Sequence, residues 1–195
     1  FDAALIGARE LGLFAHDTRF LSHYELSIEG AEVAYLSAET TGDAINQIDL
    51  MLGGADAADF LDDPAHYVHI RRRQLVDDDF VEEITFTNYL RRELAITVTI
   101  RFAADFADIF EVRGAHRPRR GETRPPELRP HEVDLAYGGL DDRELVTTLS
   151  FRPTPDRLTE REARFDVTLG PGERSGIEVF CSVSSGERPP TTRCR

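Results

Sequence analysis

Hydrophobic and polar residues alternate over much of the chain, and the clearest example lies at residues 94–102. There Leu94, Ile96, Val98, Ile100 and Phe102 occupy the even positions, while alanine, threonine and arginine occupy the odd ones. A period of two residues is that of a β-strand with one buried face. The pattern therefore predicts a strand whose even-numbered side chains face the core.

The same alternation recurs along the chain, and glycine, proline or aspartate interrupts it at short intervals. A polar stretch separates residues 80–89 from residues 94–102, which predicts an antiparallel hairpin. Short interrupted strands are typical of an all-β fold, and we expect an antiparallel β-sandwich with few short helical turns over residues 1–188. The further elements expected are strands at residues 20–29, 32–37, 67–76, 133–137, 145–151, 165–169 and 177–183, and helical turns at residues 3–11, 44–52 and 56–61.

The composition is that of a globular protein, because 41% of the 195 residues are hydrophobic and 30% are charged. The 36 acidic residues outnumber the 23 basic ones, and a formal charge of −13 argues against nucleic acid or an anionic membrane as partner. No apolar run approaches the roughly 18 residues that span a bilayer, and no signal peptide is visible. Together with the low cysteine count, this leads us to expect a cytoplasmic protein. Two cysteines are too few for a disulfide framework, and Cys181 is expected to be a small buried hydrophobe.

Candidate catalytic and metal-binding residues are sparse. His66 and His69 have a spacing that would face a metal together on a helix, but the apolar residues around them favour a strand, where they diverge. His16 and Asp17 are adjacent, and neighbours on a strand point to opposite faces. Neither pair predicts a metal site or a catalytic centre, and no cofactor is expected.

Arginines and prolines are interleaved in the segment from residue 113 to residue 130. The simpler interpretation of this segment is a long solvated loop. The alternative is a basic lip that binds an anion or docks another domain. The arginines on which that alternative depends are Arg117, Arg119, Arg120, Arg124 and Arg129.

Two stretches carry more information than their chemistry alone. Residues 12–22 read GLFAHDTRFLS, and residues 104–114 read ADFADIFEVRG. Together with the pair Asn88-Tyr89 and a turn at residues 169–173, they resemble the N-terminal domain of bacterial glycogen debranching enzymes of the amylo-α-1,6-glucosidase type. The resemblance covers nearly the whole chain.

The resemblance implies a non-catalytic domain that precedes an (α/α)-toroid catalytic domain in a glycoside hydrolase trimming α-1,6 branches of glycogen-like glucans. The catalytic carboxylates would belong to the toroid, and none is expected in this chain. Residues 189–195 have the composition of a linker, and we expect them to begin the connection to that absent domain. The expected partners are this C-terminal catalytic domain and α-glucan or glycogen.

The resemblance also singles out charged residues as substrate-cleft or interdomain candidates. Asp17 and Arg19 would anchor the first motif, in a mutual ion pair or across the domain boundary, because residues two apart share one face of a strand. The alternative is that such residues satisfy buried backbone groups within the sandwich. The candidates of the second motif are Asp105, Asp108, Glu111 and Arg113.

Two other functions remain open. The first is a stand-alone α-glucan-binding module, which would hold glycogen through exposed Tyr24, Tyr67 or Tyr89, although the absence of tryptophan counts against it. The second is a homo-oligomerising scaffold that pairs through exposed sheet edges.

Overall fold

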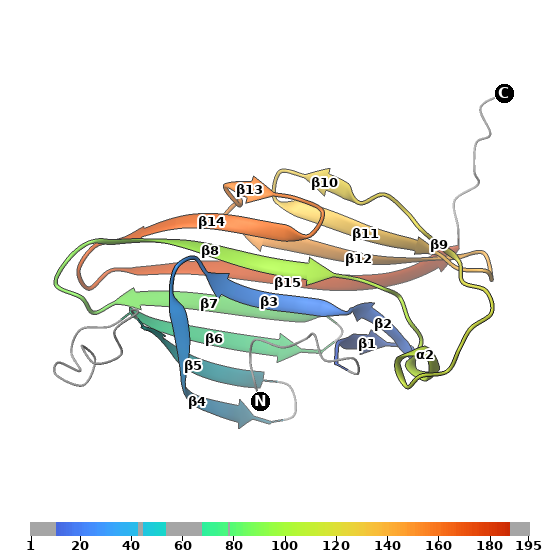
Figure 1. Cartoon of the computed structure of the whole chain (residues 1–195), viewed down its shortest axis with the longest axis horizontal. Coiled ribbons are helices and arrows are strands. Elements are labelled where there is room, and N and C mark those ends of the chain that lie inside the picture. Colours follow the sequence, from blue (N-terminus) through green and yellow to red (C-terminus); the bar gives the residue numbers. More distant parts are fainter. Residues whose placement is uncertain (1–10, 43–44, 54–67, 78, 188–195) are drawn as a thin grey trace.

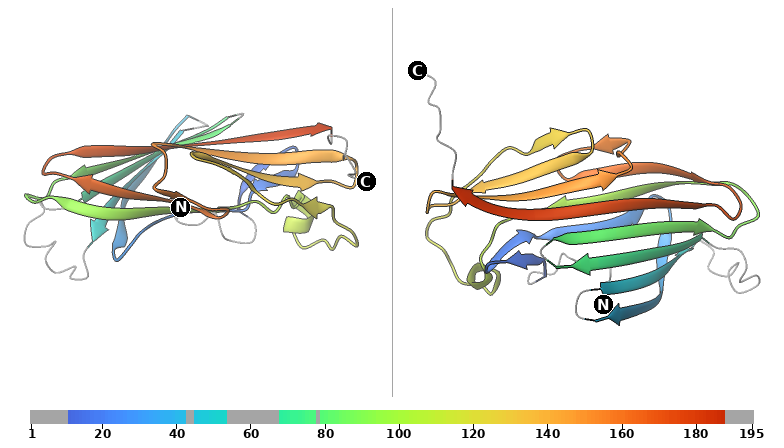
Figure 2. Two further views of the ribbon diagram at one scale, coloured as in Figure 1. Left: turned by 90° about the horizontal axis from the view of Figure 1, so that it is seen from above. Right: turned by 180° about the vertical axis from the view of Figure 1, so that it is seen from behind.

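The alternating segments form two antiparallel sheets packed face to face, in a computed structural model that describes residues 11–42, 45–53, 68–77 and 79–187 (Figure 1). Seen along the layers, the two sheets lie one above the other (Figure 2). The expected all-β sandwich is confirmed. The larger sheet has nine strands in the order β10 (Glu127–Arg129), β11 (Glu132–Gly138), β12 (Arg143–Arg152), β15 (Arg174–Glu187), β7 (Phe80–Asn88), β6 (Val68–Val76), β5 (Ile45–Gly53) and β4 (Glu32–Thr41), with β9 (Glu122–Thr123) paired to β11.

The smaller sheet has four strands, and a separate two-stranded hairpin lies at one end of the sandwich. Among the described residues there is one short helix, α2 (Ile109–Val112), which follows β8 (Leu94–Ala103) in the chain. The smaller sheet runs in the order β13 (Arg157–Leu158), β14 (Glu162–Leu169), β8 (Leu94–Ala103) and β3 (His23–Ile28), and the hairpin consists of β1 (Leu13–Ala15) and β2 (Thr18–Leu21).

None of the helical turns expected from the sequence coincides with α2. The turn expected at residues 44–52 is wrong, because this segment forms β5 and buries Ile48, Leu50 and Leu52 at every second position. The turn expected at residues 56–61 lies outside the described residues, as does nearly all of the one at residues 3–11.

The hairpin expected between residues 80–89 and 94–102 is also wrong, because β7 and β8 belong to different sheets. The connection between them crosses from one layer of the sandwich to the other. Asn88 holds this crossover with its side-chain amide, which donates to the carbonyl oxygens of Arg92 and Leu169, both at 2.9 Å. Its backbone exchanges hydrogen bonds with the crossover from β14 to β15, where Gly172 N donates to Asn88 O at 2.8 Å. One buried asparagine therefore ties two sheet-to-sheet crossovers together.

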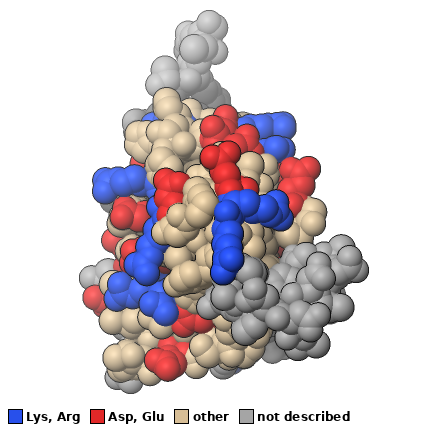
Figure 3. All heavy atoms as spheres, turned by 90° about the vertical axis from the view of Figure 1, so that its left-hand side faces the viewer, with Lys and Arg blue, Asp and Glu red and all other residues tan. Residues whose placement is uncertain are grey.

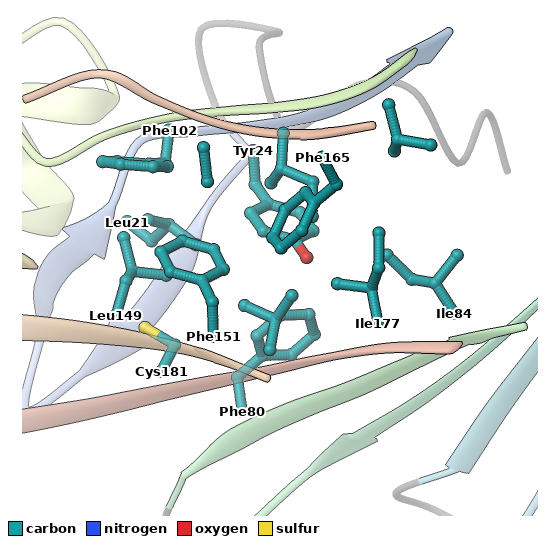
Figure 4. Close-up of a cluster of buried hydrophobic side chains, with 14 of the residues drawn as sticks. Leu21, Tyr24, Phe80, Ile84, Phe102, Leu149, Phe151, Phe165, Ile177 and Cys181 are labelled. Atoms are coloured by element: carbon teal, nitrogen blue, oxygen red, sulfur yellow. The ribbon is translucent and has the colours of Figure 1, made fainter. Parts of the chain in front are cut away.

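The core lies between the two sheets and is built from the inward residues of each alternation. Figure 4 shows Phe102 and Phe165 of the smaller sheet in one cluster with Phe151, Ile177 and Cys181 of the larger sheet. Cys181 is fully buried, as expected, and burial raises the pKa of its thiol to about 12.

A charged network lies inside this core. Arg72 and Glu82 are 1% and 0% exposed, and Arg72 Nε donates to Glu82 Oε1 at 2.7 Å. The hydroxyl of Tyr24, on the opposite sheet, donates to Glu82 Oε2 at 2.5 Å. Burial, followed by the charge of Glu82, raises the pKa of Tyr24 well above its ordinary value. Arg71 and Arg73 project to the other face of β6 and are exposed, which fits the alternation expected of a strand.

Candidate functional site

The two signature stretches converge at one end of the sandwich, on the right in Figure 1, although they are far apart in the sequence. A bidentate ion pair links β2 to the loop after β8. Arg19 Nε donates to Asp105 Oδ1 at 3.1 Å, and Arg19 Nη2 donates to Asp105 Oδ2 at 2.5 Å. Arg19 Nη1 also donates to the carbonyl oxygen of Leu11 at 3.1 Å. Paired contacts of this kind fix orientation as well as distance.

Backbone hydrogen bonds reinforce the same junction. Arg19 N donates to Ala107 O at 2.8 Å, and Ile109 N donates to Asp17 O at 2.8 Å. Between them, Thr18 and Asp108 form an isolated antiparallel bridge. The first motif is thus paired as a short strand against the second one.

Asp17 and Arg19 do not share a strand face, so that part of the expectation is wrong. His16 and Asp17 form the turn between β1 and β2, with φ values of 46° and 59°. Two successive residues with positive φ are typical of the tight turns that join twisted strands. Asp17 therefore contributes its carbonyl oxygen to the junction, and Arg19 takes its carboxylate partner from the second motif.

Helix α2 is held by the second motif itself. The side chain of Asp108 accepts hydrogen bonds from Phe110 N and Glu111 N at 2.8 and 2.9 Å, and Glu111 reaches back to the backbone N–H of Asp108. This reciprocal arrangement is a capping box. Arg113 follows as the C-cap and its side chain is exposed.

Most arginines of the loop after α2 are neutralised by carboxylates. Arg117 pairs with Asp108, and Arg120 Nε lies 3.3 Å from Glu111 Oε1. Arg124 pairs with Glu144 at 3.0 Å, and Arg129 is similarly engaged with acidic residues of β11. The loop also contains the short strands β9 and β10. It is therefore more structured, and less of a free basic lip, than its composition indicates.

A cavity of about 640 Å³ opens between these elements. Its inner wall is aromatic: Phe106 stacks on Tyr137 with ring centres 5.6 Å apart, and Phe20 meets Phe106 edge-on at 5.8 Å. Phe106 has a φ of 51°, an uncommon conformation for a bulky residue that marks a constrained backbone. The rim comes from the β1–β2 hairpin, the second motif, the loop after α2, the β11–β12 turn, the start of β12 and the end of β15. Its residues are His16, Thr18, Asp108, Arg117, Arg120, Leu140, Asp141, Arg143 and Ser185.

Close backbone packing shapes one side of the cavity. A Cβ atom on Gly121 would lie 1.9 Å from the carbonyl oxygen of Gly138, so only glycine fits at this position. Gly121 N donates to the hydroxyl of Tyr137 at 2.6 Å, and the guanidinium of Arg120 lies 5.8 Å from the centre of the same ring. The arginine-rich loop is thereby fastened to β11.

The opposite end of the sandwich has a different character. Figure 3 shows acidic and basic side chains interspersed there, with no visible area of a single sign. Surface charges arranged in this way favour solubility and contribute little to stability.

His69 lies on β6, as the strand interpretation requires, and its proposed metal partner His66 lies outside the described residues. His69 Nε2 and Arg71 Nε each lie 2.8 Å from Asp49 Oδ1. Burial alone would raise the pKa of Asp49, but hydrogen bonds from Arg71 and Gln47 and nearby positive charge lower it. Within the described ranges, no group of three or more His, Cys, Asp or Glu side chains is placed to hold a metal ion.

The tyrosines considered for glycogen binding are unequally placed. Tyr24 is 2% exposed and inside the core, Tyr67 lies outside the described residues, and Tyr89 is 44% exposed. The expectation of an exposed Tyr24 is therefore wrong. In the part of the chain that the structure describes, no helix is long and apolar enough to cross a membrane.

These features define a β-sandwich domain that carries a structured cavity at one end. The chain belongs to the family of the N-terminal domain of some glycogen debranching enzymes, whose model matches residues 3–179. No curated protein sequence matches the chain.

Two solved structures align with most of this chain, and the first of them is similar to it in fold. A kojibiose phosphorylase from the human microbiome aligns with 87% of this chain at a TM-score of 0.60 and 10% identity. This chain covers 23% of the length of that protein. The Slr1438 protein of Synechocystis sp. PCC 6803 aligns with 79% of this chain, which covers 66% of that protein, at a TM-score of 0.45 and 11% identity.

Proposed function

We propose that this chain is the non-catalytic N-terminal domain of a debranching glycoside hydrolase of the amylo-α-1,6-glucosidase type. In this proposal the domain packs on an (α/α) catalytic domain, and its cavity end forms part of the wall of the glucan-binding cleft. The observation that carries the proposal is the convergence of the two signature motifs, 86 residues apart, through the Arg19–Asp105 ion pair.

The chemistry of the cavity end supports a positioning role. A glycosidase acid must be a carboxyl group that donates a proton to the leaving oxygen. The carboxylates of the second motif act instead as acceptors, since Asp105, Asp108 and Glu111 each receive hydrogen bonds or ion pairs from arginine or from backbone N–H groups. These residues hold a fixed shape around the cavity, which is what a wall of a cleft requires.

The position of β15 also supports the proposal. In the antiparallel pairing of these strands, Glu187 of β15 lies opposite Arg143 of β12. Ser185 and Arg143 both line the cavity. The strand therefore leaves the sandwich beside the cavity. A domain that follows β15 would meet the sandwich at this end.

The test is made in the full-length enzyme, with Arg19→Ala to release the junction and Arg143→Ala to change the exposed rim. We expect kcat/KM on branched glucan to fall at least tenfold in Arg19→Ala, which corresponds to about 1.4 kcal/mol of transition-state stabilisation. Arg152→Ala is the matched control, because it removes an exposed arginine that pairs with Glu178 away from the cavity. Unchanged turnover in folded Arg19→Ala and Arg143→Ala proteins would refute the cleft role.

A further inference from the structure

The two most exposed large hydrophobic side chains of the described residues lie at the cavity end. Phe110 on α2 and Leu140 in the β11–β12 turn are each 67% exposed. Single exposed apolar residues are ordinary on protein surfaces, whereas grouped ones mark interaction sites. Leu140 lines the cavity together with Asp108, the residue that caps the helix of Phe110. Leu140 therefore lies at the cavity itself, and Phe110 lies two residues along the chain from another of its lining residues.

The way α2 is held indicates that presenting Phe110 matters. The helix has only four residues and buries none of them, so it contributes little to the core. A helix this short is not stable on its own in water. It is nevertheless fixed at its start by the capping box and by Ile109 N donating to Asp17 O, and at its end by Ala115 N donating to Phe110 O at 2.8 Å. The contacts of both signature motifs therefore hold an apolar side chain out toward solvent.

The charges near Phe110 indicate the chemistry of the surface that would cover it. Arg113 and Arg119 are exposed, and neither forms an ion pair with any of the described residues, unlike Arg117 and Arg120. Guanidinium groups without an ionic partner among the described residues, at the end of the helix of Phe110 and in the loop after it, favour a partner surface that is apolar at its centre and acidic at its edge.

We propose that Phe110 and Leu140 are the two apolar contacts through which this domain docks on its own catalytic domain, with Arg113 and Arg119 facing acidic side chains of that domain. This inference rests on the proposed function. The catalytic domain is the partner proposed because β15, whose Glu187 lies opposite Arg143 in the strand register, ends at the same cavity.

The first test is hydroxyl-radical footprinting of the full-length protein at several concentrations. Tyr35, which is 57% exposed on the opposite edge of the larger sheet, is the internal reference for a solvent-facing side chain. We expect the oxidation rates of Phe110 and Leu140 to be at least tenfold lower than their exposure in the isolated domain predicts. This protection should be the same at every protein concentration. Protection that appears only at high concentration would mean that a second copy covers the patch, and would overturn the proposal.

The second test uses variants of the full-length protein. Phe110→Ser with Leu140→Ser is expected to raise the rate of proteolytic cleavage between the domains at least tenfold. The matched control is Tyr35→Ser with Leu36→Ser, which removes two other exposed apolar side chains and is expected to leave the rate unchanged. Charge reversal by Arg113→Glu with Arg119→Glu is expected to act in the same direction as the first variant.

The outcomes separate this inference from the proposed function. If Phe110 and Leu140 are oxidised freely while another face of the sandwich is protected, the domains do pack, but the docking surface is wrong. If no face of the sandwich is protected, the packing itself is refuted, and this inference is refuted with it.

Discussion

Replacing Arg72 with methionine tests whether the buried charge network is as tightly coupled as the structure indicates. Arg72 is 1% exposed and makes two hydrogen bonds to Glu82, at 2.7 and 3.1 Å. Removing the guanidinium leaves the carboxylate of Glu82 buried without its opposite charge, which costs about 3–5 kcal/mol. For a domain of this size, the melting temperature should fall by about 6–20 °C, at about 2–4 °C per kcal/mol.

The assay is urea unfolding of the 195-residue chain, followed by circular dichroism and compared at equal m-value. Arg73→Ala is the control on the next residue, because its exposed ion pair contributes only about 0–1 kcal/mol. The triple variant Tyr24→Phe, Arg72→Met, Glu82→Met should recover most of the loss, since it removes every charge and the hydroxyl together. The reasoning is wrong if Arg72→Met costs no more than Arg73→Ala, or if the triple variant is less stable than Arg72→Met.

Three further predictions concern single side chains. Asp49→Asn should be less stable than wild type above pH 3.8, and because the folded-state pKa of Asp49 is lowered, the difference should disappear as the pH falls through that pKa; urea unfolding from pH 7 to pH 2 measures it. In a Cys194→Ser background, Cys181 should react with a thiol reagent at pH 8 about a thousandfold more slowly than in urea, and rapid labelling of the native protein would contradict its burial. Asn88→Ala and Asn88→Asp should both lose about 2–4 kcal/mol, since each leaves buried carbonyl oxygens without their donor; a stable Asn88→Asp protein would show that the donated bonds matter little.

Strand positions could be predicted because the signal for them is local. The alternation from Leu94 to Phe102 identifies a strand and its buried face without any knowledge of its neighbours. Which sheet a strand joins is not local. The polar residues after Asn88 suit a hairpin or a crossover equally, and the choice depends on hydrogen bonds to Leu169, 81 residues away. Residue propensities describe short segments, so they cannot predict a contact between residues this far apart in the sequence.

The candidate site could be predicted only in part from the sequence, for the same reason. The ion pair between Arg19 and Asp105 joins two segments that are far apart in the sequence, and no rule of residue spacing predicts that they lie close together. Helix α2 has no buried face and so no helical period, although Asp108 and Glu111 stand three residues apart, as a capping box requires. That spacing was the signal available for the helix. The burial of Arg72 was also implicit, because it falls on the same face of the strand as Val68 and Ile70.

The place of β15 in the larger sheet has a consequence for how the chain folds during synthesis. It is the last strand described, yet it lies between β12 and β7 and joins the β10–β12 group to the β4–β7 group. A ribosome adding about 5–20 residues per second needs roughly 5–20 s to extend the chain from Asn88, where β7 ends, to Glu187. Until then β7 and β12 each present an open edge that pairs readily with other chains. The nascent domain thus passes through a period in which two unpaired strand edges are open to aggregation or to chaperone binding.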